Sequence, residues 1–347
     1  MRFILPRGSL LNAEPGLAYG VRAAAMFRVF DCILGALAQA LPQQINAAGS
    51  SQGSILLVSV PDPETGGTKV SVVQPLAGGS GGRPMKDGLD GVDVAMGYLR
   101  NVPSESVEQE MPVLISRYRL RPDSGGAGYY RGGMGVELEL KVFPPNGVIT
   151  ARGMERYVFR PWGRLGGSAG TLGYTKLHSG TERETEVGKI DVLSLDPGDT
   201  ILIGTQGGGG YGDPLDRPTD KVLHDVREEL VSRGRARSEY GVVIVDDCVD
   251  GDATAAARAQ MRSEREDQPL AEFDFGPERV AYEKVWTSAL QDAILAATIA
   301  YPHRLRHFLR MRLFALLDAR IAAGEAIMPD EIGTLVAEIQ QRELGVH

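Results

Sequence analysis

Hydrophobic positions in the middle of the chain follow the two-residue period of β-strands. Five short runs either alternate apolar and polar residues or are wholly apolar, and glycine or proline separates them. These runs are ILLVSV from Ile55, TKVSVVQPL from Thr68, VLISRYRLR from Val113, VELELKVF from Val136 and DTILIG from Asp199. The pattern predicts that the middle of the chain is mainly strand.

Helical periodicity appears towards both ends. Apolar residues recur at helical spacing from Ala23 to Leu41, and Pro42 follows, which predicts a buried helix. A polar helix is predicted over 253–266, followed by a linker, DQPLAEFDFGPER from Asp267. The last part is predicted to form three helices, over 280–300, 302–323 and 329–344.

Together these elements predict an α+β protein. A β-rich domain with glycine loops is expected over 1–270, and a helical appendage that contacts another subunit over 271–347. One appendage helix carries a leucine stripe with too much apolar surface to stand alone in water. The stripe packs against this domain, against its neighbouring helices or against another subunit, and we expect part of it to dock on a partner subunit. Its members are Leu305, Leu309, Leu313, Leu316 and Leu317.

Charge and cysteine usage narrow the class of protein. The net charge is -8 and no basic block is present, so nucleic acid is not an expected partner. Cys32 and Cys248 have no CxxC neighbour, which indicates a reducing, cytoplasmic compartment. The N-terminal stretch is too short for a signal peptide, and no apolar run reaches the length of a membrane span.

Glycine is in excess, with 44 residues, and it is clustered. Such clusters place backbone at positive φ or close to another chain or a ligand, because no Cβ is in the way. For Gly207–Gly210 we expect conformations closed to other residues, strained by positive φ. The clusters are GGSGGRPMKDGLDG from Gly78, DSGGAGYYRGGMG from Asp123, RLGGSAGTLG from Arg164 and GTQGGGGYGDP from Gly204.

Sequence motifs for nucleotide binding and for a catalytic serine occur in the chain, but without the helix that should follow each of them. Gly207, Gly209 and Gly212 fit GxGxxG, but Asp213 and Pro214 form a turn where a phosphate-binding helix should begin. GxSxG occurs around Ser51, Ser80 and Ser168, never directly before a helix.

The potential metal ligands also lack the right surroundings. His303 and His307 have ligand spacing but lie among arginines, and DDCVDGD lacks the ligands of a calcium loop. We therefore assign no catalytic residue and no metal ligand in this chain.

The glycine loops supply the remaining candidates for substrate contact. Aspartate beside a glycine turn ordinarily caps the turn, although function is enriched on loops. Loop arginines either clamp a phosphate or carboxylate or pair with these aspartates. The substrate-loop candidates are Gly81, Arg83, Asp87, Asp90, Asp123, Ser124, Arg131, Gly208, Gly209 and Asp213.

Several segments in this order resemble the C-terminal half of the hydantoinase B/oxoprolinase family. The resemblance covers about 260 residues and also relates the chain to subunits of acetone and acetophenone carboxylases. The segments that carry it are PRGSLLNAEP from Pro6, GGSGGRPMKDGLDG, NVPSESVEQEMPV from Asn101, YRLRPDSGGAGYYRGGMG from Tyr118, DPGDTILIGTQGGGGYGDPLDR from Asp196 and YGVV from Tyr240.

The resemblance implies a subunit of an ATP-dependent enzyme complex. An A-type subunit would bind ATP and Mg and phosphorylate the substrate, and the B-type subunit would complete the reaction while water is excluded. Hydrolysis of a cyclic amide (a hydantoin, 5-oxoproline or a lactam) is expected. The alternatives are carboxylation of a ketone such as acetone or acetophenone, and a noncatalytic scaffold.

The resemblance begins at the middle of the family pattern. The N-terminal half of full-length members carries stretches such as NDPYxGGTH, which resemble ligands of a divalent metal (Zn, Mn or Fe), and this chain has no counterpart. Because the chain begins with Met1, we expect that half as a separate polypeptide. No cofactor is then expected on this chain alone.

Overall fold

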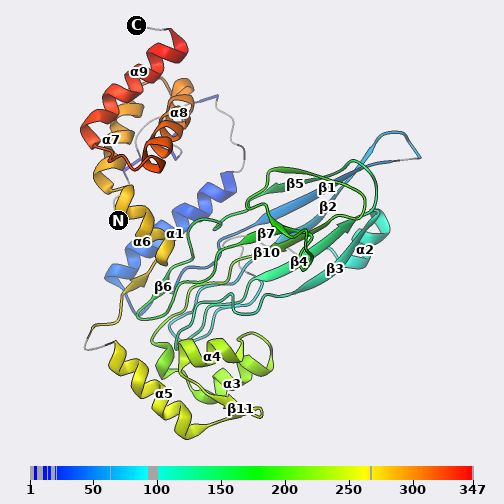
Figure 1. The fold of residues 1–347 in the computed structure, drawn as a ribbon, viewed down its shortest axis with the longest axis vertical. Coiled ribbons are helices and arrows are strands. Elements are labelled where there is room, and N and C mark those ends of the chain that lie inside the picture. The colour runs from blue at the N-terminus through cyan, green and yellow to red at the C-terminus, as the bar shows by residue number, and fades with distance from the viewer. Residues whose placement is uncertain are drawn as a thin grey trace. The chain divides into compact units, whose positions relative to one another are not determined.

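The computed structural model divides into two compact units (Figure 1), Val21–Glu278 and Arg279–His347 with Met1–Gly20. The predicted fold class is confirmed, because antiparallel sheets are followed by C-terminal helices. The predicted domains, 1–270 and 271–347, stay a prediction. The structure describes residues 4–5, 11–13, 15–16, 20, 22–62, 64–92, 101–265 and 268–345.

The larger unit contains two antiparallel sheets. The four-stranded sheet has the order β2-β1-β5-β9, with β1 at Ser54–Pro61, β2 at Thr68–Leu76, β5 at Gly147–Arg152 and β9 at Val192–Leu195. The five-stranded sheet has the order β3-β4-β10-β7-β8, with β3 at Val113–Leu120, β4 at Val136–Val142, β10 at Thr200–Gly204, β7 at Tyr174–Leu177 and β8 at Thr185–Glu186. Each of the five predicted runs forms a strand: β1, β2, β3, β4 and β10.

The two sheets bury one core between them, as Figure 1 shows by their layered arrangement. Every second residue of a strand points inward, so Leu56 and Val58 of β1 meet Leu138 and Leu140 of β4 in this core. Burial of each such side chain contributes roughly 1.5–3 kcal/mol. The short helix α2 (Ser104–Glu110) adds Val107 to the same core.

Short helices follow the last large strand. They are η1 (Pro214–Asp216), α3 (Thr219–Arg227), α4 (Arg233–Tyr240) and α5 (Gly251–Glu264), with a hairpin of β11 (Ile244–Val245) and β12 (Cys248–Val249) before α5. Ser232 begins α4, because its hydroxyl accepts a hydrogen bond from the Arg235 backbone N–H. Gly241 ends α4 in the left-handed conformation, with φ of 62°.

The predicted N-terminal helix forms as α1 (Arg22–Ala40), but it is less buried than expected. Met26 is 51% exposed and only Ala38 is fully buried along the described part of its length. Helical spacing therefore predicted the helix correctly and its burial wrongly.

The predicted linker after α5 is wrong for its central part. Strand β13 (Phe273–Asp274) pairs with β6 (Gly163–Arg164), and the Phe273 ring lies 5.3 Å from Trp162 in an edge-on contact. Glu278 accepts hydrogen bonds from Arg160 at 2.8–3.0 Å. This segment is thus held on the larger unit by backbone, aromatic and ionic contacts.

The smaller unit is helical. The helices are α6 (Pro277–Val285), α7 (Ser288–Ile299), α8 (His303–Ala322), η2 (Pro329–Glu331) and α9 (Ile332–Leu344). The single helix predicted over 280–300 is two helices, because the Thr287 hydroxyl accepts from the Leu290 N–H and starts a new one.

The leucine stripe on α8 packs within this unit. Leu309, Leu313 and Leu317 have no exposed surface and share a core with α7 and α9, and Leu305 and Leu316 pack against that core. Neighbouring helices therefore cover the centre of the stripe, while Leu305 and Leu316 stay partly exposed, and docking of part of the stripe on a partner stays a prediction. Within the described ranges, no helix is both long and apolar enough to cross a bilayer.

Candidate functional site

The glycine clusters come together as one bundle of extended segments beside the sheets. We call it the glycine bundle and define it as residues 47–50, 78–91, 123–135, 161–173 and 205–212. Backbone hydrogen bonds join these segments, and successive residues of one segment bond to different neighbours. The Gly208, Gly209 and Gly210 N–H groups donate to the carbonyl oxygens of Gly133, Ala48 and Ser168 at 2.8–2.9 Å.

The run Gly207–Gly210 is enclosed by backbone. A methyl group on Gly208 would lie 2.0 Å from the Ser80 carbonyl oxygen, and one on Gly209 would lie 2.1 Å from that of Trp162. Methyl groups on Gly207 and Gly210 would both strike the segment at 124–127, at 2.2 and 1.9 Å. Facing the same neighbour every third residue is the repeat of a polyproline II helix.

This geometry corrects the expected reason for the four glycines. None of Gly207–Gly210 has φ in the left-handed region, whereas Gly212 does, at 77°. The four residues are closed to other side chains because neighbouring backbone fills the space that a Cβ would need. No nucleotide phosphate can lie against this run either, since protein backbone already occupies its sides.

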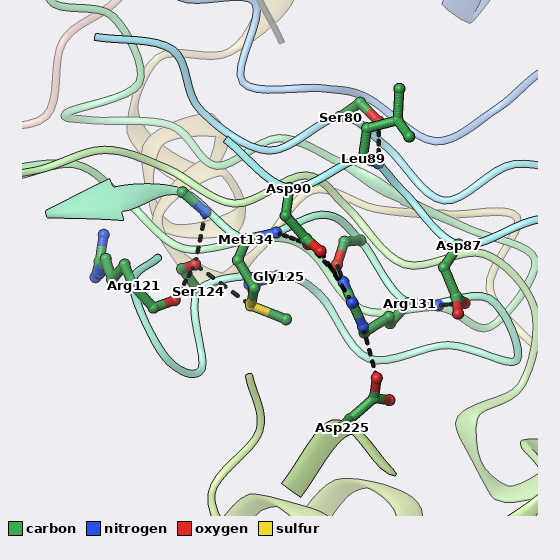
Figure 2. A network of polar contacts seen from close by, with 12 residues as sticks. Ser80, Asp87, Leu89, Asp90, Arg121, Ser124, Gly125, Arg131, Met134 and Asp225 are labelled. Atoms are coloured by element: carbon green, nitrogen blue, oxygen red, sulfur yellow. Dashed lines mark hydrogen bonds and ion pairs between the residues drawn. The ribbon is translucent and has the colours of Figure 1, made fainter. Parts of the chain in front are cut away.

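A network of charged side chains spans the glycine bundle, and Figure 2 shows its centre at Arg131. The Arg131 guanidinium donates to both carboxylate oxygens of Asp90, at 2.8 and 3.1 Å. Its Nε donates to Asp225 Oδ1 at 3.0 Å. Asp90 also accepts from the Met134 backbone N–H at 2.7 Å. Arg131 thus bridges two carboxylates that come from different parts of the chain.

Arg217 makes a second bridge in the same network. It donates to both oxygens of Asp87, at 2.6 and 2.9 Å, and to Asp225 Oδ2 at 2.8 Å. Asp87 Oδ1 also accepts from the Arg131 N–H at 2.8 Å. The Arg217 side chain is 1% exposed and that of Asp225 is 3% exposed. Three carboxylates therefore share two buried guanidinium groups.

The electrostatics of the network favour its charged form. Burial works to raise the pKa of Asp87, but hydrogen bonds and charge from Arg217, with the charge of Arg131, outweigh burial and lower that pKa. Burial works to lower the pKa of Arg131, and its contacts with Asp90 and Asp225 outweigh burial and raise it. The shifts of both groups thus favour the charged forms of Asp87 and Arg131.

Asp123 and Ser124 hold the next turn of the bundle. Asp123 has φ of 59° and accepts from the Ser232 N–H at 2.8 Å, which fixes the start of α4. The Ser124 hydroxyl is buried, donates to the Arg121 carbonyl oxygen at 2.7 Å and accepts from the Gly135 N–H at 2.8 Å (Figure 2). Both side chains act on backbone in this structure.

The other candidates lie at the borders of the bundle. Arg83 donates to the Asp87 carbonyl oxygen, and a methyl group on Gly81 would lie 1.9 Å from the Ala47 carbonyl oxygen. Asp213 accepts from the Leu215 N–H, which starts η1, and pairs with Arg265 at 2.6 Å. Whether any of the ten candidates contacts substrate stays a prediction.

Two members of the network were missed from the sequence, Arg217 and Asp225. Asp225 lies three residues after Val222 on the buried side of α3. A carboxylate in line with apolar residues of a helix is the available signal, because such a group needs a buried partner. Arg217 carries no comparable signal, since it follows a turn.

The bundle serines with GxSxG spacing make structural hydrogen bonds. The Ser80 hydroxyl accepts from the Leu89 N–H at 2.6 Å, and that of Ser168 from the Ala127 N–H at 2.7 Å. Among the residues that the structure describes, no three His, Cys, Asp or Glu side chains gather as ligands for a metal ion.

The part of the network that reaches the surface is the loop at 83–90. The side chains of Asp87 and Asp90 are 30% and 25% exposed, and Met85 is 81% exposed. The buried side of the same network is rigidly paired. The arrangement can therefore present a fixed loop to another molecule, and it contains no free nucleophile and base among the candidates.

Comparison with known proteins identifies the class of protein that this fold represents. The family model of hydantoinase B/oxoprolinase matches residues 1–214. The chain belongs to the hydantoinase B/oxoprolinase family, as its sequence resemblance implied.

Two curated relatives are named as subunits of enzymes. The chain is 36% identical over 266 residues to the beta subunit of caprolactamase from Pseudomonas jessenii, covering 73% of this chain and 45% of the relative. It is 30% identical over 248 residues to the B subunit of a putative D-/L-hydantoinase from Pseudomonas sp. (strain NS671), covering 71% and 41%. The chain thus spans less than half the length of these relatives.

Two solved structures share the fold. The ATP-dependent caprolactamase of Pseudomonas jessenii superposes with a TM-score of 0.55 at 33% identity, covering 64% of this chain and 40% of that chain. Nucleotide-free acetone carboxylase also gives a TM-score of 0.55, at 20% identity, covering 79% and 41%. The likeness to acetone carboxylase concerns the fold alone.

Proposed function

We propose that this chain is part of the B-type subunit of an ATP-dependent enzyme that completes the hydrolysis of a phosphorylated cyclic amide, such as a lactam, hydantoin or 5-oxoproline. The observation that carries the proposal is the 36% identity over 266 residues to the caprolactamase beta subunit. The two TM-scores are equal, so the fold by itself favours neither a hydrolase nor a carboxylase. The sequence identity, however, is 33% to caprolactamase and 20% to acetone carboxylase.

The chain would work with two companions. One is a separate polypeptide that carries the N-terminal half of the B-type sequence and a divalent metal, which we call the B-type companion. The other is a hydantoinase A-type subunit that binds ATP and Mg and phosphorylates the amide. Both curated relatives are named as single subunits of an enzyme, which supports a multi-subunit complex.

Within that complex, the glycine bundle would act as a rigid support for the loop at 83–90. Arg131 and Arg217 bind the two carboxylates of this loop, Asp87 and Asp90, so the loop is positioned before any substrate arrives. Such preorganisation matters because a phosphorylated amide must be held in one geometry and shielded from bulk water. The role assigned to this chain is therefore to position and shield the intermediate.

The proposal is tested by reconstituting the three polypeptides and measuring ATP hydrolysis with product formation. Caprolactam, a hydantoin and 5-oxoproline form one substrate panel, and acetone and acetophenone form the other, each with and without bicarbonate. We expect ring opening of at least one cyclic amide, coupled to ATP hydrolysis and independent of bicarbonate. Bicarbonate-dependent carboxylation of a ketone would instead identify a carboxylase subunit, and no turnover with any substrate would favour a scaffold.

A further inference from the structure

The two sheets of the larger unit differ on their outer faces. On the five-stranded sheet, the outward residues of β4 are Glu137, Glu139 and Lys141. Arg119 on β3 donates to Glu137 at 2.8 Å. An antiparallel sheet with one solvated face has polar residues of this kind on that face. The outward side of β4 is therefore polar, although Leu202 of the neighbouring β10 lies on the same face and is buried.

The outer face of the four-stranded sheet carries several aliphatic residues, interspersed with the polar residues Ser59, Thr150 and Ser194. One row runs across all four strands, because Val72 lies opposite Leu57, Leu57 opposite Thr150, and Thr150 opposite Val192. Val72 is 45% exposed and Val192 is 63% exposed. We call this surface the aliphatic face; its members are Ile55, Leu57, Val70, Val72, Val148 and Val192.

The sequence of β1 is typical of a strand that is packed against other protein on both of its sides. Leu56 and Val58 point into the core and are at most 1% exposed, while Ile55 and Leu57, which alternate with them, point outward. Strands that are apolar on both sides are typical of sheets buried on both faces. A contiguous apolar patch on a soluble protein marks a site of interaction with another protein.

We infer that the aliphatic face is the docking surface for the B-type companion. The 266 matched residues are 45% of the caprolactamase beta subunit, so more than half of that relative lies outside the shared part. A segment of that size needs apolar surface to pack against, and this face offers it. The inference rests on the proposed function, because the companion is part of that proposal.

The charges around the face define the chemistry of the docking partner. Arg152 lies opposite Ile55 on β5, and its Nη1 is 3.7 Å from an Asp191 carboxylate oxygen, so its charge is locally balanced. An apolar surface with little net charge therefore fits this face best, since an unpaired charge buried against it would be costly.

The test measures binding of the wild-type chain and of matched variants to the purified B-type companion from the same genome. Val72→Glu with Val192→Glu should weaken binding by at least about tenfold, because two charges would enter an apolar contact. Val158→Glu is the control, since Val158 is also 63% exposed but lies outside the sheets, and it should leave binding unchanged. Circular dichroism and melting temperature establish that each variant is folded.

A photo-crosslinking residue at position 192 provides a second measurement without added charge. We expect a crosslink to the companion from position 192 and none from position 158. Wild-type binding that the double variant leaves unchanged would overturn the inference while the proposed function stands. A crosslink from position 192 to a second copy, or within the same chain, would also overturn it. If the wild-type chain binds no B-type companion, the proposed function fails and the inference fails with it.

Discussion

Arg217 and Asp87 form a two-contact ion pair, with Nη1–Oδ1 and Nη2–Oδ2 distances of 2.6 and 2.9 Å, although 130 residues separate them in the chain. The Arg217 side chain is 1% exposed. This pair joins the surface loop at 83–90 to the segment before α3. The loop that we propose to face the substrate is thus held from inside the molecule.

Removing the carboxylate at the centre of the network should lower the free energy of unfolding more than removing an exposed carboxylate. Asp225→Ala leaves Arg131 and Arg217 each short of a buried partner, and we expect a loss of about 3–5 kcal/mol in the free energy of unfolding. Asp216→Ala is the control, because Asp216 pairs with Arg262 at the surface and such pairs contribute roughly 0–1 kcal/mol. Urea denaturation of both variants decides the matter, and equal losses would contradict a buried network.

Gly208→Ala should damage the glycine bundle severely. The added methyl group would lie 2.0 Å from the Ser80 carbonyl oxygen, which belongs to backbone that cannot move aside alone. We expect a loss of at least about 3 kcal/mol, at the upper end of overpacking effects, or a chain that does not fold. Gly251→Ala is the control, because nothing lies within 4 Å there and it should be near neutral. Similar melting temperatures for both variants would contradict the enclosed geometry.

The stability of the larger unit should depend on pH through Asp87. Its folded-state pKa is lowered, so its contribution is fully present above its unfolded-state pKa, about 3.9, and is lost as pH falls through the folded value. Asp87→Asn should therefore be less stable than wild type at pH 7, with a difference that shrinks below about pH 4. Denaturation curves from pH 7 to pH 3 measure this, and a difference that grew on acidification would contradict the sign.

Shortening the chain should reveal how far the larger unit extends. Truncation after Glu272 removes Phe273 and Asp274, whose carboxylate accepts from the Ala169 N–H at 2.7 Å, and also the Arg160–Glu278 pair. We expect this truncation to lower the melting temperature of the larger unit clearly, whereas truncation after Val285 should leave it nearly unchanged. Equal melting temperatures would mean that β13 adds nothing to the unit.

The purified chain by itself is expected to hydrolyse no cyclic amide and to bind no stoichiometric transition metal. The reason is the composition of the candidates, which contain aspartates already paired with arginines and no ligand cluster of neutral histidine. Metal analysis of the isolated chain checks this. One equivalent of tightly bound zinc, manganese or iron would contradict it.

Local patterns in the sequence were enough to predict the strands and helices that have regular periodicity. Alternation in VELELKVF predicted β4, and helical spacing from Ala23 predicted α1, because these periods depend only on residues close in the chain. The break between α6 and α7 was missed although it is local. Thr287 is a good N-cap residue, but the continuous apolar pattern around it outweighed that signal.

The candidate network depended on contacts between distant segments. The sequence placed Asp87, Asp90 and Arg131 in glycine loops and left open whether the arginine pairs with the aspartates; only the fold showed that it does, and that Arg217 and Asp225 complete the set. The glycine excess was likewise visible from the composition, but its cause was not. The sequence by itself determined which segments are extended, helical or free of side chains, because those properties arise within a few residues. Only the tertiary structure decided which segments approach, since close contact depends on residues far apart in the chain.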